Sequence, residues 1–436
     1  MTIPALGRAP SGRPPAGLAP VRTVLPNGVV VIAKETKAIP AVTINLAVRA
    51  GSICDPQDAR GAVHLISKVI DRGTVNRSAA DIAEDLDSRG ITLSTSVTRH
   101  LLSLACTCLA EHFEPVCSLL GDVVMSPSFP EGELATRKAE TITSIRQDED
   151  DPAVRAVESL MGLLYPGGHP YGRLTKGTVD DVERLTRERL VQLYGARFAP
   201  SVISAVIVGD VPVGLATAVA TRVFDRWRVP QPPPIAVPSV RPAIRRQRLV
   251  IPMMNKVQAD IAYGFVTIPR ADPAYYAFSL MNNVLGQYAM GGRLGDRIRE
   301  RQGMAYYVFS SFDPSVGEGP LLVRAGVSPA NVDRTVASID EEIGRIARDG
   351  VTAKELAESQ QYLVGSMPRA LETNAGIANF LQTSESFGLG LDYDVRLPDL
   401  LCAVTLDDVH AAARRVLDPA CATIVIAGPY EDHGMG

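Results

Sequence analysis

Residues 202–208, Val-Ile-Ser-Ala-Val-Ile-Val, form an apolar run that ends at Gly209, and they follow a helical stretch beginning at Asp180-Asp181-Val182. The chain repeats this arrangement near its end. Asp407-Asp408-Val409 begins a helical stretch that leads to the apolar run 422–427 and Gly428. A helix followed by a buried strand, found twice in the same relative place, indicates a duplicated unit. The sequence therefore predicts two homologous halves.

A proline-rich segment separates the two halves. Residues 229–246 (VPQPPPIAVPSVRPAIRR) show neither helical nor strand periodicity, which is typical of a linker. Residues 1–20 are rich in proline and glycine and predict a flexible arm. We therefore expect an N-terminal domain at 21–228 and a C-terminal domain at 247–436.

Short strands and helices alternate within each half. The patterns typical of strands lie at 29–32, 42–48, 91–97, 101–109, 259–266, 305–312 and 321–327. The patterns with helical spacing lie at 61–70, 78–89, 113–124, 274–285, 294–301 and 331–348. Strand meanders with helices packed on one side predict an α+β fold of two homologous α/β-sandwich domains.

The composition excludes several classes of function. Lys+Arg of 44 against Asp+Glu of 48 gives a net charge of −4, which provides no basic field for nucleic acid or an anionic membrane. No apolar run approaches the ~20 residues that span a bilayer, and the first residues lack the apolar region of a signal peptide. The six cysteines are scattered without metal-binding pairs, which favours free buried thiols, with Cys106 and Cys108 on one face of a strand. We therefore expect a cytoplasmic protein without a nucleic-acid or membrane partner.

The stretch Gly61-Ala62-Val63-His64-Leu65-Ile66-Ser67-Lys68 has helical spacing and is followed by Arg72-Gly73-Thr74. It resembles the zinc helix of the insulinase-like metallopeptidases, the family of pitrilysin and the mitochondrial processing peptidase, which reads roughly G-x-x-H-F-L-E-H. In such a helix two histidines bind zinc, and the glutamate between them activates the metal-bound water. Here Ser67 stands at the position of that base and Lys68 at the second ligand, and an ammonium beside His64 repels a divalent cation.

The third zinc ligand of this family is a glutamate in a later helix, ahead of an acidic D-D-P turn. The matching run is Thr143-Ser144-Ile145 ahead of Glu149-Asp150-Asp151-Pro152, so Thr143 occupies the ligand position. With two of three ligands and the base replaced, the resemblance predicts no metal or other cofactor in this chain. His64 then becomes an ordinary helical histidine. His169 lies in a loop that resembles the family's Y-P-x-H-P-Y-G segment, and we expect a structural turn there.

A second motif of the family is intact. The run from Arg299 to Tyr306 (RERQGMAY), preceded by Gly292-Arg293-Leu294, resembles the family segment S-R-L…R-E-x-R-G-L-A-Y, and residues 325–332 resemble its A-G-x-S-P-E-N-V stretch. In relatives the Arg/Tyr pair reaches the zinc site of a partner domain, holds the substrate carbonyl and helps to stabilise the oxyanion. The resemblance implies this role for Arg299 and Tyr306. An arbitrary pair of this type would instead be a solvated helical arginine and an amphipathic strand tyrosine.

The glycine-rich segment from Gly286 to Gly292 precedes this motif. It is either a loop that contacts peptide or a connection between two helices, and the connection is favoured because three glycines alone do not form a cradle. Lys256, Gln258 and Asn282 are polar residues near the second core, and no role is assigned to them.

Members of the two-domain branch of this family form dimers around a peptide-sized chamber. In some heterodimers one chain supplies H-x-x-E-H and the other supplies the Arg/Tyr pair. The resemblance therefore implies a non-catalytic subunit of a zinc endopeptidase, with zinc in the partner and short unfolded peptides as substrates, such as the precursor peptide of pyrroloquinoline quinone. The alternative is a structural or peptide-binding protein, similar to the core subunits of the respiratory cytochrome complex.

Overall fold

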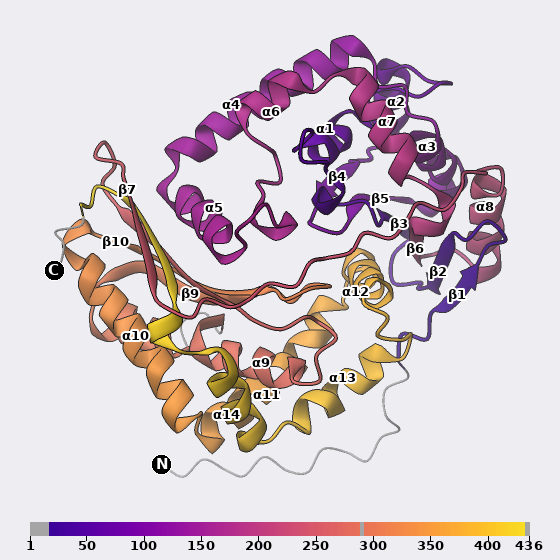
Figure 1. The fold of residues 1–436 in the computed structure, drawn as a ribbon. Helices are drawn as coiled ribbons and strands as arrows, with labels where there is room; N and C mark the ends of the chain where they lie inside the picture. Colours follow the sequence, from indigo (N-terminus) through magenta and orange to yellow (C-terminus); the bar gives the residue numbers. More distant parts are fainter. Residues whose placement is uncertain (1–16, 288–291, 432–436) are drawn as a thin grey trace, which may run out of the picture.

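The computed structural model describes residues 17–287 and 292–431, which form one mixed β-sheet in each half of the chain (Figure 1). The first sheet has the strand order β1-β2-β6-β3-β5-β4. Its strands are β1 (Val21–Val24), β2 (Val30–Glu35), β3 (Ala41–Val48), β4 (Ser94–Val97), β5 (Leu102–Leu109) and β6 (Ile203–Gly209).

The second sheet has the order β7-β11-β8-β10-β9. Its strands are β7 (Gln247–Pro252), β8 (Ala259–Val266), β9 (Ala305–Phe312), β10 (Pro320–Val327) and β11 (Thr423–Gly428). In each sheet the last strand of the half lies between a parallel and an antiparallel neighbour: β6 between β2 and β3, and β11 between β7 and β8. This shared topology confirms the predicted duplication and the α+β fold.

The helices surround the two sheets. In the first half they are α1 (Ala62–Val69), α2 (Ala79–Asp87), α3 (Phe113–Met125), α4 (Glu131–Asp150), α5 (Pro152–Leu164), α6 (Val179–Arg184), α7 (Arg187–Arg197) and α8 (Val213–Phe224). In the second half they are α9 (Tyr275–Asn282), α10 (Val332–Asp349), α11 (Ala353–Ala370), α12 (Asn374–Ser386), α13 (Tyr393–Cys402) and α14 (Leu406–Val416). The two Asp-Asp-Val motifs begin α6 and α14, where Thr178 with Asp181 and Thr405 with Asp408 form equivalent capping boxes.

The segment between α9 and β9 differs from the prediction of two regular α-helices. Helix α9 ends at Asn282, and wider π-helical turns follow at Asn283–Gln287 and Gly295–Arg301. A Cβ atom on Gly286 would lie 2.9 Å from the backbone nitrogen of Ser310, so the first of these turns lies directly against β9. Of the glycine-rich segment, residues 288–291 lie outside the described residues.

Helix α5 belongs to the first half of the chain but packs on the second sheet (Figure 1). Its fully buried Leu160 joins Ala262 of β8 and Val425 of β11 in one apolar cluster. The fit is tight, because a Cβ atom on Gly264 of β8 would lie 3.0 Å from the Cδ2 of Leu160. The core beneath the second sheet is therefore completed by the first half.

Helix α12 makes the reciprocal exchange and covers the first sheet. Its buried Leu381 packs with Ile32 of β2 and Val206 of β6. At its start, the Asn374 Nδ2 donates a hydrogen bond to the carbonyl of Ala41 at 2.9 Å. Each half of the chain thus supplies one helix to the core of the other.

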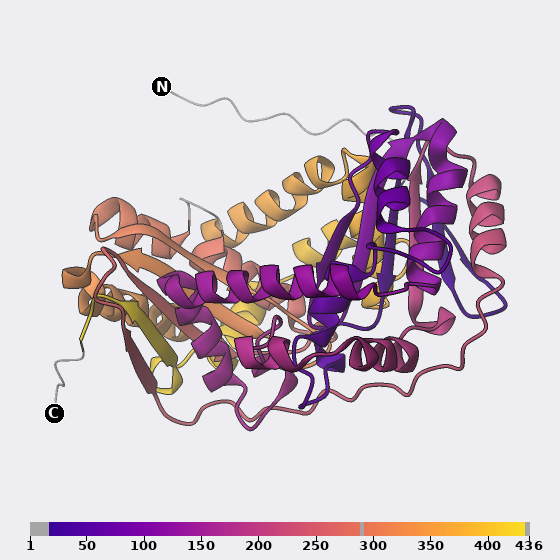
Figure 2. The same cartoon turned by 90° about the horizontal axis from the view of Figure 1, so that it is seen from above.

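The proline-rich segment 229–246 contains neither helix nor strand and crosses from one half to the other along one side of the molecule (Figure 2). The first half holds it in place. The Arg197 Nη1 donates to the carbonyl of Pro233 at 3.1 Å, and the His169 Nε2 lies 2.8 Å from the carbonyl oxygen of Pro238. Residues 17–20 precede β1, and the backbone N–H of Leu18 donates to Asp394 of α13.

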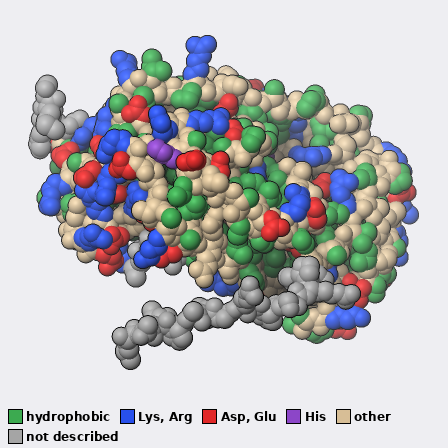
Figure 3. Space-filling view, turned by 90° about the horizontal axis from the view of Figure 1, so that it is seen from below, with side chains coloured by type: hydrophobic (Ala, Val, Ile, Leu, Met, Phe, Trp, Pro, Cys, Tyr) green, Lys and Arg blue, Asp and Glu red, His purple; other side chains and the backbone are tan. Residues whose placement is uncertain are grey.

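Positive and negative side chains are intermixed on the face seen from below (Figure 3). Within the described residues, no helix is both long enough and apolar enough to cross a bilayer. The predicted burial of Cys106 and Cys108 on one face of β5 is confirmed. Cys402, in contrast, is exposed at the end of α13, so the expectation of buried thiols fails at that position.

Candidate functional site

The degenerate metal motif lies on α1. His64 is partly buried and Lys68 is exposed. Ser67 is 2% exposed, and its hydroxyl donates to the carbonyl of His64 at 2.7 Å. The hydroxyl of Ser67 is therefore used within the helix, where the family has the carboxylate that acts as the base.

A second lysine stands close to this motif. The Lys176 Nζ donates to the Ser144 Oγ of α4 at 2.8 Å and forms an ion pair with Asp148, one turn further along α4. Burial, together with the positive charges of Lys68 and Lys176, lowers the pKa of His64 to about 4. The imidazole is thus neutral at pH 7 and is flanked by two ammonium groups.

Thr143 points away from this cluster. Its side chain is exposed, and its hydroxyl donates to the carbonyl of Ala139, one turn earlier in α4, at 2.9 Å. The neighbouring Ser144 is the α4 residue that binds Lys176. The structure therefore brings together His64, Lys68 and Lys176 but leaves Thr143 apart from them.

Lys176, Ser144 and Asp148 were not predicted as site residues, because no local pattern in the sequence marks them. Lys176 reaches α1 because its backbone packs on the start of that helix: a Cβ atom on Gly61 would lie 2.2 Å from the carbonyl oxygen of Lys176. Gly61 has a φ of 80°, a left-handed conformation that glycine adopts without strain. This contact joins residues far apart in the chain, so only the folded structure shows it.

These residues do not suit zinc. A zinc site needs three or four His, Cys, Asp or Glu ligands, and within 17–287 and 292–431 no cluster of three such residues could hold a metal. The Lys176 ammonium pairs with the nearest carboxylate, Asp148. The positive charges of Lys68 and Lys176, which act on His64, also oppose the binding of a cation there.

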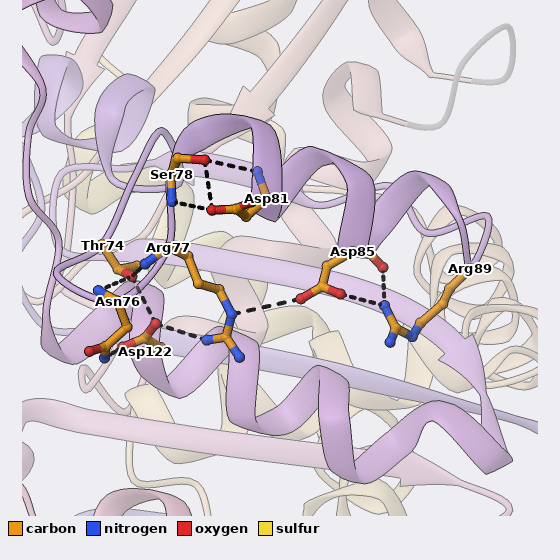
Figure 4. A network of polar contacts seen from close by, with 8 residues as sticks. All are labelled: Thr74, Asn76, Arg77, Ser78, Asp81, Asp85, Arg89 and Asp122. Carbon is orange, nitrogen blue, oxygen red and sulfur yellow. Dashed lines mark hydrogen bonds and ion pairs between the residues drawn. The ribbon is translucent and has the colours of Figure 1, made fainter.

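The loop after α1 has a structural role. The Asp122 carboxylate of α3 accepts hydrogen bonds from Thr74 Oγ1, Asn76 Nδ2 and Arg77 Nη1, each at 2.8 Å (Figure 4). Asp122 is 9% exposed, so this carboxylate is buried and charge-compensated. The Gly-Thr motif that follows the zinc helix in the family thus anchors α1 to α3 here.

His169 is also a buried residue of a turn, since its Nδ1 accepts a hydrogen bond from the backbone N–H of Tyr171.

Arg299 and Tyr306 lie on consecutive elements of the second half. Arg299 is in the π-helical turn Gly295–Arg301, has a 47% exposed side chain, and meets only its neighbour Glu300 at 3.7 Å among the ion pairs of the described residues. Tyr306, near the start of β9, is 66% exposed. Both side chains are therefore free to reach a group outside this chain.

Ion pairs fix the turn that carries Arg299. Glu342 of α10 is 2% exposed and binds both Arg297 and Arg345. The Arg293 Nε lies 2.7 Å from Glu355 of α11. The chain thus holds the backbone beside Arg299 through buried charge, while the Arg299 side chain remains in solvent.

Hydrogen bonds also fix the strand beneath Tyr306. Successive side chains of a strand point to opposite faces, so Tyr307 faces the sheet side on which Asp260 lies. The Tyr307 hydroxyl donates to Asp260, which also accepts a hydrogen bond from the Gln258 Nε2 at 3.1 Å. Gln258, for which no role was predicted, therefore helps to position the start of β9.

Comparisons with known proteins agree with this geometry. The family model "Insulinase (Peptidase family M16)" matches residues 30–165, and "Peptidase M16 inactive domain" matches residues 184–363. An uncharacterized zinc protease of Streptomyces coelicolor is 26% identical over 416 residues, which cover 94% of this chain and 90% of the relative. The non-peptidase homolog YmxG of Helicobacter pylori is 22% identical over 383 residues, 87% of each chain.

A crystal structure of a peptidase M16 inactive domain from Pseudomonas fluorescens has a TM-score of 0.86 to this structure at 26% identity, covering 94% of this chain and 98% of that one. The two matched models are the two domains of one family, in the order in which the duplicated halves occur here. The chain therefore belongs to the insulinase (M16) peptidase family, whose inactive-domain model matches its residues 184–363.

Proposed function

We propose that this chain is the non-catalytic subunit of a heterodimeric zinc endopeptidase, in which Arg299 and Tyr306 act at the zinc site of a catalytic H-x-x-E-H partner. One observation carries the proposal: the chain keeps two exposed donors, Arg299 and Tyr306, on a rigidly held framework, although two lysines stand near the histidine of its own metal helix. A guanidinium and a phenol hydroxyl are suited to a carbonyl oxygen that gains negative charge in the transition state.

In this proposal the partner holds the zinc and the glutamate that activates water. Arg299 and Tyr306 orient the substrate carbonyl and stabilise the oxyanion. The substrates are short unfolded peptides in the cytoplasm, and the precursor peptide of pyrroloquinoline quinone is one of this class.

The test is a cleavage assay on the complex purified after co-expression with an H-x-x-E-H subunit. Arg299→Ala and Tyr306→Phe should each lower kcat by about 10²–10³-fold, the usual effect of losing one oxyanion donor. Arg301→Ala is the matched control, because Arg301 is 74% exposed on the same turn and pairs with Asp296. A complex that forms normally and keeps its kcat in both variants would rule out the proposed role.

The chain alone should hold no stoichiometric zinc and cleave no peptide. Chelator-sensitive cleavage by the purified chain without a partner would contradict the proposal. The second candidate, a structural or peptide-binding protein, is favoured if the complex forms but Arg299 and Tyr306 have no effect on its activity.

A further inference from the structure

A pocket of about 720 Å³ lies at the junction of the two halves. Its walls come from the first half at Arg49 and Ile53, from the linker at residues 231–235, and from the second half at residues 313–316. This volume lies within the roughly 300–1,000 Å³ typical of sites for small ligands. Neither the metal motif nor the Arg/Tyr pair uses the pocket.

Two arginines give the pocket a positive charge. Arg49 and Arg197 both line it, and neither forms an ion pair with a carboxylate in the part of the chain that the structure describes. Both donate hydrogen bonds to backbone carbonyl groups: the Arg49 Nη2 to Ser201 at 3.0 Å and the Arg197 Nη1 to Pro233 of the linker at 3.1 Å. The third arginine, Arg99, is neutralised by Asp313 at 2.7 Å. Two uncompensated guanidinium groups therefore attract an anion, and their planar fork fits a carboxylate.

The remaining walls combine two kinds of side chain. Ile53, Leu101 and Phe387 are apolar, and three proline rings of the linker add a rigid apolar surface. Thr175, Gln231 and Ser386 can form hydrogen bonds but carry no charge. A simple alkyl chain would leave these polar groups unused, whereas the amide groups of a peptide can bind them.

The pocket is remote from the Arg/Tyr site. Tyr306 lies near the start of β9, and Asp313 of the pocket wall directly follows its end. Seven residues of extended strand separate the two positions by roughly 20–25 Å at about 3.3 Å per residue. Binding in the pocket is thus a property that does not rest on the proposed function.

We infer that this pocket binds the carboxy-terminal residues of a short peptide. The terminal carboxylate lies between Arg49 and Arg197, and an apolar final side chain packs against Ile53 and the linker prolines.

The test is calorimetric titration of the full chain, without any partner, with the peptide acetyl-Ala-Ala-Leu-Leu, its carboxy-terminal amide, and decanoate. The free acid should bind, and the amide should bind at least about tenfold more weakly. Arg49→Gln and Arg197→Gln should each weaken binding of the acid by about tenfold or more, since each removes a charge-assisted hydrogen bond. Arg334→Gln is the control, because Arg334 is exposed on α10 away from the pocket and should leave binding unchanged.

A further variant guards against loss of folding. Val316 is 57% exposed at the pocket wall, so Val316→Glu should fold normally yet weaken the peptide acid by placing a negative charge beside its site. The inference is overturned if the acid gives no binding at about 1 mM, if the amide binds equally well, if decanoate binds more tightly than the peptide, or if the arginine variants bind as the wild type does. Each of these outcomes leaves the cleavage test on Arg299 and Tyr306 unaffected.

Discussion

The exchange of α5 and α12 predicts that the two halves unfold together. The perturbation is Leu160→Ala on α5, which removes a fully buried side chain packed against β8 and β11. Truncation of a buried leucine costs about 2–5 kcal/mol, and the upper part of this range applies because the backbone at Gly264 leaves little room for collapse. With a urea m-value of about 3 kcal/mol/M or more for a chain of this size, a loss of about 3.5–5 kcal/mol should lower the unfolding midpoint by at most about 1.2–1.7 M.

The single tryptophan provides the assay. Trp227 is 7% exposed and belongs to the core of the first half, whereas Leu160 packs under the second sheet. If the halves are one cooperative unit, Leu160→Ala shifts the Trp227 fluorescence transition and the far-ultraviolet circular dichroism transition by the same amount. Leu280→Ala is the matched control, because the Leu280 side chain is fully buried in the core of the second half alone. It should lower the midpoints of the fluorescence and dichroism transitions by equal amounts. An unmoved Trp227 midpoint beside an earlier dichroism transition would refute this account of the helix exchange.

Three further predictions follow from buried charges and thiols. The pKa of His64 is lowered to about 4, so the unfolded chain binds more protons than the folded chain between pH 6.5 and 4, and stability falls as the pH drops through this window. His64→Gln should reduce that loss of stability by up to about 3 kcal/mol in urea titrations. An unchanged dependence of stability on pH in this variant would contradict the prediction. Glu342→Gln should destabilise the chain by about 1.5–3 kcal/mol in the same assay, because it removes the charged acceptor of Arg297 and Arg345. Arg297 keeps its pair with Glu341, and Arg345 is half exposed, which limits the loss. Glu358→Gln at the exposed Lys354 pair should have little effect. Cys402 should react with a thiol reagent in the native protein, and an equally fast reaction of the buried thiols before unfolding would contradict the structure. Burial raises the pKa of these thiols to about 11 or 12: Cys54, Cys106, Cys108 and Cys117.

The positions of most strands and helices could be predicted because local patterns encode them. The strand β8 was predicted with the bounds that the structure has, and the capping residues Thr178 and Thr405 begin helices at the repeated Asp-Asp-Val motifs. The segment after α9 could not be predicted in detail, because its wide turns depend on the contact between Gly286 and β9.

The candidate site shows the same division. The replacement of the zinc ligands at Ser67 and Lys68, and the retained Arg299 and Tyr306, could be read from the order of residues alone. The position of Thr143 relative to the site could not be predicted, because the rotation of α4 against α1 is set by packing.

The sequence by itself determined the duplication, the α+β class and the altered metal helix, because each depends on the types and spacing of neighbouring residues. The tertiary structure alone decided that α5 packs on the second sheet and α12 on the first. It also decided that Lys176 lies near His64 and that the linker forms one wall of a charged pocket. These features join residues far apart in the chain. They depend on which apolar surfaces pack together and on which charges this packing brings close. The spacing of neighbouring residues predicts neither of these contacts.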